Sequence, residues 1–139
     1  MTDNGVDLLV DIRRRRGVRG PEYAWANAKK LNGLLYDVHV FYEHVLELAP
    51  STELLHFQHE IDRHGAGMRS RTALDPQYIE RYENEVLATA DLDAIAELLN
   101  PYERPALLCV EADASTCHRS LAAAALAPHL NASVRHLSV

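Results

Sequence analysis

The sequence predicts an α/β fold: a three-layer, Rossmann-like arrangement in which a mainly parallel sheet carries helices on both faces. Two observations support this prediction. Short apolar, strand-like segments alternate along the chain with longer segments of helical periodicity. Residues 6–12 are also apolar enough to be buried on both faces of a sheet, and helices between strands favour parallel pairing through right-handed crossovers.

The first part of the chain predicts a strand, a helix and a second strand. Residues 6–12 are apolar except for two aspartates, as expected for a buried strand. Residues 22–35 repeat apolar side chains with a helical period, and Pro21 suits the first turn of such a helix. Residues 38–46 are rich in valine and aromatic side chains, which favours a strand.

Helices dominate the region after the second predicted strand. A serine–threonine pair can cap a helix over residues 53–63, which glycines then end. An Asp-Pro step opens a longer helix over residues 75–90. The remaining predicted elements are a helix over residues 92–99, a strand over 106–110, a helix over 117–127 and a last strand over 134–137.

Composition predicts one globular domain over residues 1–139. The 139 residues are 47% hydrophobic and 24% charged, and a chain of this length buries roughly two-thirds of its unfolded surface. No apolar run approaches the roughly 20 residues that span a bilayer, so we expect a cytoplasmic protein with no membrane association. Two cysteines are too few for a disulfide scaffold, and we expect Cys109 to be a buried thiol.

Polar residues come directly after two predicted strands, at the edge of the sheet where α/β proteins bind ligands. Four consecutive arginines occupy residues 13–16, and Cys117, His118 and Arg119 open the helix over residues 117–127, where helix N–H groups favour negative charge. The net charge of −6 disfavours long duplex nucleic acid. The locally basic crevice instead predicts a small anionic, phosphate-bearing ligand, with a solvated basic face as the alternative.

Two carboxylates accompany this crevice. Asp11 and Glu111 lie at the ends of predicted strands, so one could act as a general base while the other orients a ligand hydroxyl. Ion pairs with Arg13 and Arg119 are an alternative of equal weight. The predicted catalytic residues are Asp11, Glu111, Cys117 and His118. The predicted substrate-binding residues are Arg13, Arg15, His44, Arg119 and Ser120.

Metal binding and thiol chemistry are further alternatives. The helix over residues 53–63 carries histidines without a metal-binding motif. Cys109, Cys117 and His118, together with His44, suit zinc chemically. However, adjacent residues of a helix are expected to diverge, so we expect Cys117 and His118 not to share an ion and predict no metal or cofactor. A redox pair of the two cysteines and a nucleophilic Cys117 are also open.

Four motifs occur in order along the chain: Asp11-Ile12-Arg13, Tyr42-Glu43-His44, Cys109-Val110-Glu111 and Cys117-His118-Arg119-Ser120. By these motifs the chain resembles the bacterial domain of unknown function 488 family over nearly its whole length. The resemblance implies a fold and a candidate site but no established activity. Family members usually begin with an additional strand and helix, whereas here only residues 1–5 precede the first strand. We therefore expect an exposed sheet edge and a homodimer formed through it.

Three functions remain open. The first is a small hydrolase or transferase acting on a nucleotide-like or nucleic-acid-derived substrate, and the sequence favours it. The second is a non-catalytic module that binds an anion or a partner protein through the same crevice. The third is a metal or thiol-redox sensor.

Overall fold

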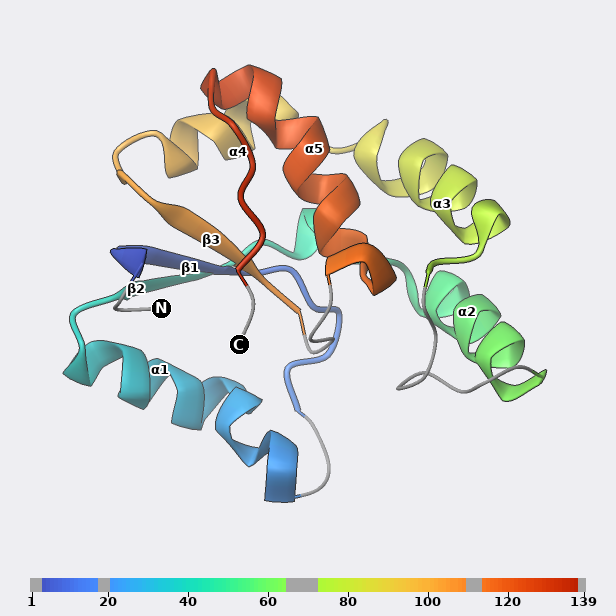
Figure 1. The fold of residues 1–139 in the computed structure, drawn as a ribbon, viewed down its shortest axis with the longest axis horizontal. Helices are drawn as coiled ribbons and strands as arrows, with labels where there is room; N and C mark the ends of the chain where they lie inside the picture. Colours follow the sequence, from blue (N-terminus) through green and yellow to red (C-terminus); the bar gives the residue numbers. More distant parts are fainter. Residues whose placement is uncertain (1–3, 18–20, 65–72, 110–113, 138–139) are drawn as a thin grey trace.

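Three short parallel strands form the centre of the molecule (Figure 1). The computed structural model describes residues 4–17, 21–64, 73–109 and 114–137. The strands are β1 (Leu8–Asp11), β2 (Phe41–His44) and β3 (Pro105–Leu108), in the order β2-β1-β3. Asp11 pairs with His44 on one side and with Leu108 on the other. The carboxyl ends of all three strands therefore meet at one edge of the sheet, where α/β proteins place their ligand sites.

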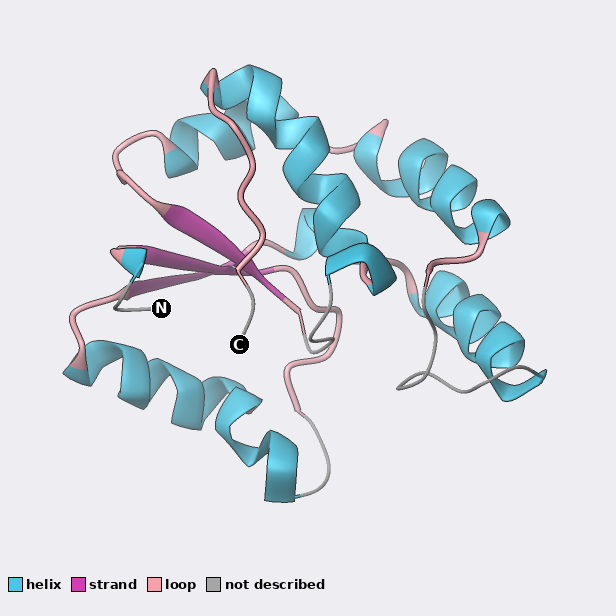
Figure 2. Ribbon diagram, viewed as in Figure 1, coloured by secondary structure: helices cyan, strands magenta, loops and turns pink. Residues whose placement is uncertain are grey.

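The helices lie around this sheet (Figure 2). None of the described helices is long and apolar enough to cross a membrane. The α-helices are α1 (Ala28–Asp37), α2 (Thr52–His64), α3 (Pro76–Tyr82), α4 (Leu92–Leu99) and α5 (His118–Leu130). Shorter helical segments are η2 (Pro21–Ala26), η3 (Leu46–Leu48), the π-helical η4 (Glu83–Leu87) and η5 (Ala114–Thr116).

Alternation along β1 produces the two faces of the sheet. Leu8 and Val10 point into a cluster that contains side chains of α4 and α5, including Leu126. Leu9 points the other way and packs with Leu31 and Leu35 of α1. Because successive side chains of a strand point to opposite faces, β1 is covered by helices on both sides. The predicted three-layer α/β fold is confirmed.

A third apolar cluster joins α2 to α3 and η4 beyond the carboxyl ends of the strands (Figure 1). It is built around Leu54, Tyr78 and Tyr82, all of which are buried. The Tyr82 hydroxyl donates to the carbonyl oxygen of Leu48 at 2.6 Å. This bond ties α3, at its junction with η4, to the chain just after β2, so the helical unit is held against the end of the sheet where the polar motifs lie.

The predicted last strand over residues 134–137 is wrong. The described chain after α5 forms no helix or strand, and the side chain of Val134 is 43% exposed. α5 ends because Asn131 adopts the left-handed conformation, with φ of 49°, and its N–H caps the last turn. A β-branched segment becomes a strand only when another strand pairs with it, and residues 134–137 pair with none of the described strands.

Candidate functional site

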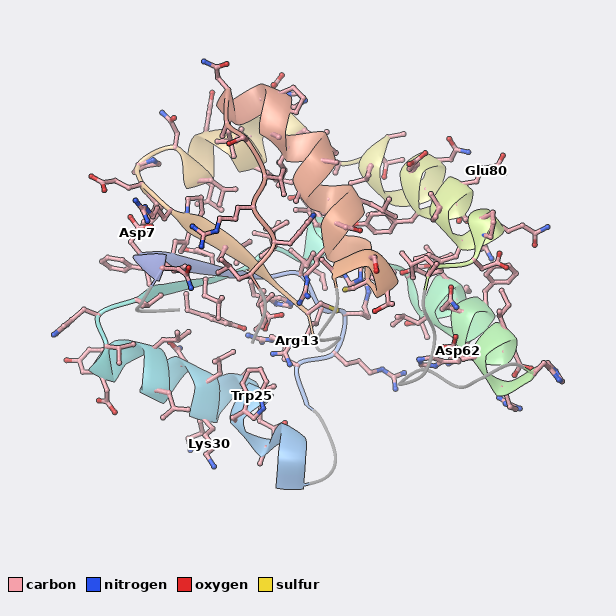
Figure 3. All side chains as sticks on the ribbon, in the orientation of Figure 1. Asp7, Arg13, Trp25, Lys30, Asp62 and Glu80 are labelled. Atoms are coloured by element: carbon pink, nitrogen blue, oxygen red, sulfur yellow. The ribbon has the colours of Figure 1, made fainter. Side chains whose placement is uncertain are left out.

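A buried ion pair closes the carboxyl end of β1. Arg13 donates from Nε to Asp11 Oδ1 at 2.8 Å and from Nη2 to Asp11 Oδ2 at 2.7 Å. The Asp11 side chain is fully buried and that of Arg13 is 4% exposed. Asp7 lies just before β1 and Arg13 lies just after it (Figure 3). Because a guanidinium and a carboxylate match in two parallel hydrogen bonds, Asp11 holds the Arg13 side chain in one orientation.

Tyr42 of β2 completes the environment of this carboxylate. Its hydroxyl donates to Asp11 Oδ2 at 2.6 Å. Burial opposes ionisation of Asp11, but the hydrogen bonds from Arg13 and Tyr42 outweigh it and hold the pKa of that carboxyl below its ordinary value. Tyr42 is not among the predicted site residues, although it lies two positions before His44 and on the same face of β2. The signal that could have identified it is its Tyr-x-His motif.

One nitrogen of Arg13 remains without a hydrogen-bond partner. The Nη1 atom is buried and has none among the residues that the structure describes. Burial lowers the pKa of Arg13, but the hydrogen bond and charge of Asp11 outweigh that effect and raise it, so the group stays charged. Leaving a buried donor unpaired costs about 1–3 kcal/mol, and folded proteins seldom do so. A hydrogen-bond acceptor on a ligand would remove this penalty.

Cys109, Cys117 and His118 form a second buried group, which we call the thiol–imidazole cluster. Their exposed fractions are 7%, 1% and 5%. His118 Nδ1 lies 3.7 Å from Cys117 Sγ and 3.9 Å from Cys109 Sγ. His118 Nε2 lies 3.0 Å from the carbonyl oxygen of Ile12. Since a carbonyl can only accept, Nε2 carries the hydrogen, and in the neutral form of the ring Nδ1 has the lone pair on the side of both sulfur atoms.

The start of α5 explains why Cys117 and His118 lie together, contrary to our prediction that they diverge around the helix. Cys117 is the N-cap, with φ of −138° and ψ of 147°, so its side chain leaves an extended backbone and turns back toward the helix. Its Sγ accepts from the backbone N–H of Arg119 at 3.5 Å. The Ser120 hydroxyl donates to the Cys117 carbonyl oxygen at 3.0 Å. Residues 117 and 118 therefore do not follow helical spacing.

The cluster is buried and packs against an aromatic ring. Hydrogen bonding with Cys117 and burial raise the pKa of the Cys109 thiol well above its ordinary value. The ring of Tyr82 lies 5.4 Å from the His118 ring at a tilt of 58°. The cluster and the ion pair are adjacent because His118 bonds to Ile12, the residue between Asp11 and Arg13.

The remaining predicted residues lie at different distances from this centre. His44 Nε2 contacts the carbonyl oxygen of Arg13 at 2.9 Å, so His44 supports the loop after β1. Arg119 and Ser120 are half-buried at the start of α5, whereas Arg15 is exposed. Glu111 lies outside the described residues. The structure thus brings together five of the nine predicted site residues around Ile12: Asp11, Arg13, His44, Cys117 and His118.

Comparison with protein families gives a match over most of the chain. The model of the family described as domain of unknown function DUF488 matches residues 1–126. No curated protein and no solved structure matches the chain. The match includes β1, β2, β3 and the beginning of α5, and therefore every element that contributes to the site.

Proposed function

Because the chain belongs to the domain of unknown function 488 family, whose name assigns no activity, we propose its function from the site alone. The protein is a small hydrolase or transferase acting on an anionic, phosphate-bearing substrate that Arg13 holds at the carboxyl ends of the strands. A nucleotide-like or nucleic-acid-derived molecule is the substrate class that we favour. The observation that carries the proposal is the buried Arg13 Nη1, which lacks a partner among the described residues.

Asp11 and Tyr42 prepare Arg13 for this role. The two hydrogen bonds between Asp11 and Arg13 use Nε and Nη2, which leaves Nη1 as the donor available to a ligand. A phosphate or carboxylate oxygen is the acceptor that best matches an arginine donor. Since Asp11 is fully buried and accepts bonds from Arg13 and Tyr42, we assign it a positioning role. Glu111 remains our candidate for the general base.

Cys117 and His118 are the groups that we expect to act on the held substrate. The 3.7 Å contact between Cys117 Sγ and His118 Nδ1 allows the imidazole to take the thiol proton. The Ile12 carbonyl orients the ring through Nε2, as a third group does in thiol–imidazole pairs. His118 bonds to the carbonyl of Ile12, the residue between Asp11 and Arg13, so we expect a substrate anchored by Arg13 to place its reacting atoms near Cys117 and His118.

Binding can be tested on the unaltered protein. We would label the arginine side chains with ¹⁵N and titrate the reduced protein with inorganic phosphate, nucleoside monophosphates and sugar phosphates. The Arg13 resonances should shift with at least one probe, and a concentration of 100 times Kd should stabilise the fold by about 2.7 kcal/mol. Arg13 resonances that stay unchanged with every probe would overturn the proposal.

Variants then separate catalysis from binding. Arg13→Met should lose probe binding, whereas Lys30→Gln, which removes an exposed cation on α1 away from the site, should bind as the wild type does. Cys117→Ser should keep the bound-state shift of Arg13 and lose product formation from the bound probe. If the wild type binds a probe but forms no product, the non-catalytic anion-binding module replaces the enzyme.

A further inference from the structure

We propose that Cys109, Cys117 and His118 form a binding site for a divalent metal ion that prefers tetrahedral coordination, with Zn²⁺ as the ion. The proposal goes beyond the proposed function and does not depend on it, because metal binding requires neither a substrate nor turnover. Since the ion would occupy His118 Nδ1 and the Cys117 sulfur, the thiol chemistry proposed above belongs to the metal-free protein. It rests on the positions of three ligand atoms, on the orientation of one imidazole and on the chemistry of the donor set.

The ligand atoms already have nearly the spacing that a zinc ion requires. Zinc binds thiolate sulfur at about 2.3 Å and imidazole nitrogen at about 2.0–2.1 Å, so tetrahedral angles place sulfur and nitrogen about 3.6 Å apart. The two observed distances from His118 Nδ1 are 3.7 Å to Cys117 Sγ and 3.9 Å to Cys109 Sγ. All three ligand atoms lie within 4.8 Å of one another. Shifts of a few tenths of an ångström would bring both sulfur–nitrogen distances to coordination geometry.

The imidazole is oriented as a metal ligand. Nε2 donates to the Ile12 carbonyl oxygen, which fixes the tautomer and leaves the Nδ1 lone pair directed toward both sulfur atoms. Histidine ligands of metals almost always make such a second hydrogen bond, and it fixes the ring in place. Cys117 is supported in the same way, because the backbone N–H of Arg119 donates to its sulfur.

Charge balance also favours a dication, because both thiols of the cluster are buried and could supply two thiolate ligands. A Zn²⁺ ion would neutralise two thiolates, so binding would release two protons and give a cluster without net charge. Cys₂His donor sets with a fourth position open to water or substrate occur in catalytic zinc sites. Arg13 directly follows Ile12, whose carbonyl oxygen accepts from His118.

Cobalt provides a direct test because tetrahedral Co²⁺ replaces Zn²⁺ and absorbs light. We would titrate the reduced, chelator-treated protein with Co²⁺ alone. We expect one ion per chain, thiolate-to-cobalt charge-transfer absorption, intense tetrahedral d–d bands, and loss of all these signals when Zn²⁺ is added. Release of about two protons per ion should accompany binding at neutral pH. A wild-type protein with two titratable thiols and no such spectrum would overturn the proposal.

Matched variants locate the ion. Cys109→Ser, Cys117→Ser and His118→Gln should each weaken or remove the cobalt spectrum, whereas His56→Gln, which changes an exposed histidine of α2, should leave it unchanged. Retention of the full spectrum in Cys117→Ser would also overturn the proposal. The readout requires no substrate, so an unchanged Arg13 resonance in the phosphate titration would leave the metal result intact.

Discussion

The buried ion pair between Asp11 and Arg13 should be strongly coupled in the folded protein. Asp11→Asn places an amide NH₂ group in an environment of donors and leaves a buried guanidinium without its counter-charge, since the Arg13 side chain is only 4% exposed. Removing one partner of a buried pair costs about 3–5 kcal/mol, and Arg13→Met should cost a similar amount. In the double variant both charges are gone, while the amide oxygen introduced by Asp11→Asn can still accept from Tyr42. The double variant should therefore lose at most about 3 kcal/mol of its free energy of unfolding, far less than the sum of the losses in the two single variants.

The exposed pair of Arg81 and Glu85 supplies the matched control. Its two hydrogen bonds have lengths of 2.9 and 3.1 Å, close to those of the buried pair, but its side chains are 37% and 46% exposed. Glu85→Gln should cost about 0.3–0.5 kcal/mol, because water screens such pairs. Urea unfolding at pH 7, monitored by circular dichroism, measures all variants on one scale. The reasoning would be refuted if each single variant of the buried pair lost less than about 1 kcal/mol of the free energy of unfolding. It would also be refuted if the loss in the double variant equalled the sum of the two single losses.

Three further predictions concern stability. Tyr82→Phe should lower the free energy of unfolding by about 1–2 kcal/mol in urea titrations, because it leaves the buried Leu48 carbonyl without its donor; no loss would show that water replaces the hydroxyl. Asp7 accepts from two backbone N–H groups before β3, and although burial raises the pKa of its carboxyl, these bonds outweigh burial and lower it. The folded pKa therefore lies below the unfolded value of about 3.9. The wild type should exceed Asp7→Asn in free energy of unfolding by its full margin well above pH 4, and this margin should disappear as the pH falls through the folded pKa. A margin that is independent of pH would contradict this. Leu126→Ala should lower the free energy of unfolding by about 2–5 kcal/mol in thermal or urea unfolding, because Leu126 is 2% exposed in the core. Leu98→Ala, at a 41% exposed position, should lower it much less. Equal losses at the two positions would contradict the core assignment.

Local signals in the sequence predict the helices well. The helix over residues 92–99 is confirmed with the same bounds, and its first turn is fixed by Asp91, whose side chain accepts from the Ala94 N–H. Amphipathic periodicity and caps act within a few residues, so a sequence displays them directly. The strand predicted over residues 134–137 failed because a strand depends on a partner that is distant along the chain.

Some features of the site are likewise visible in the sequence, whereas others depend on contacts between distant segments. The sequence places Asp11 and Arg13 at the end of a strand and Cys117 and His118 at the start of a helix, since both junctions are visible as changes from apolar to polar residues. It does not show that Tyr42 bonds to Asp11, because that contact requires β1 and β2 to pair with Leu9 opposite Tyr42.

The sequence by itself determined the α/β class, most helices and the strand ends at which chemistry gathers, because periodicity, caps and apolar runs are local properties of the chain. Only the tertiary structure decided that Cys109, Cys117 and His118 converge on one point and that Arg13 keeps a buried donor unpaired among the described residues. Both features depend on the register of parallel strands and on the extended backbone of Cys117. Those are set by packing between segments roughly 100 residues apart in the chain, and no local pattern encodes them.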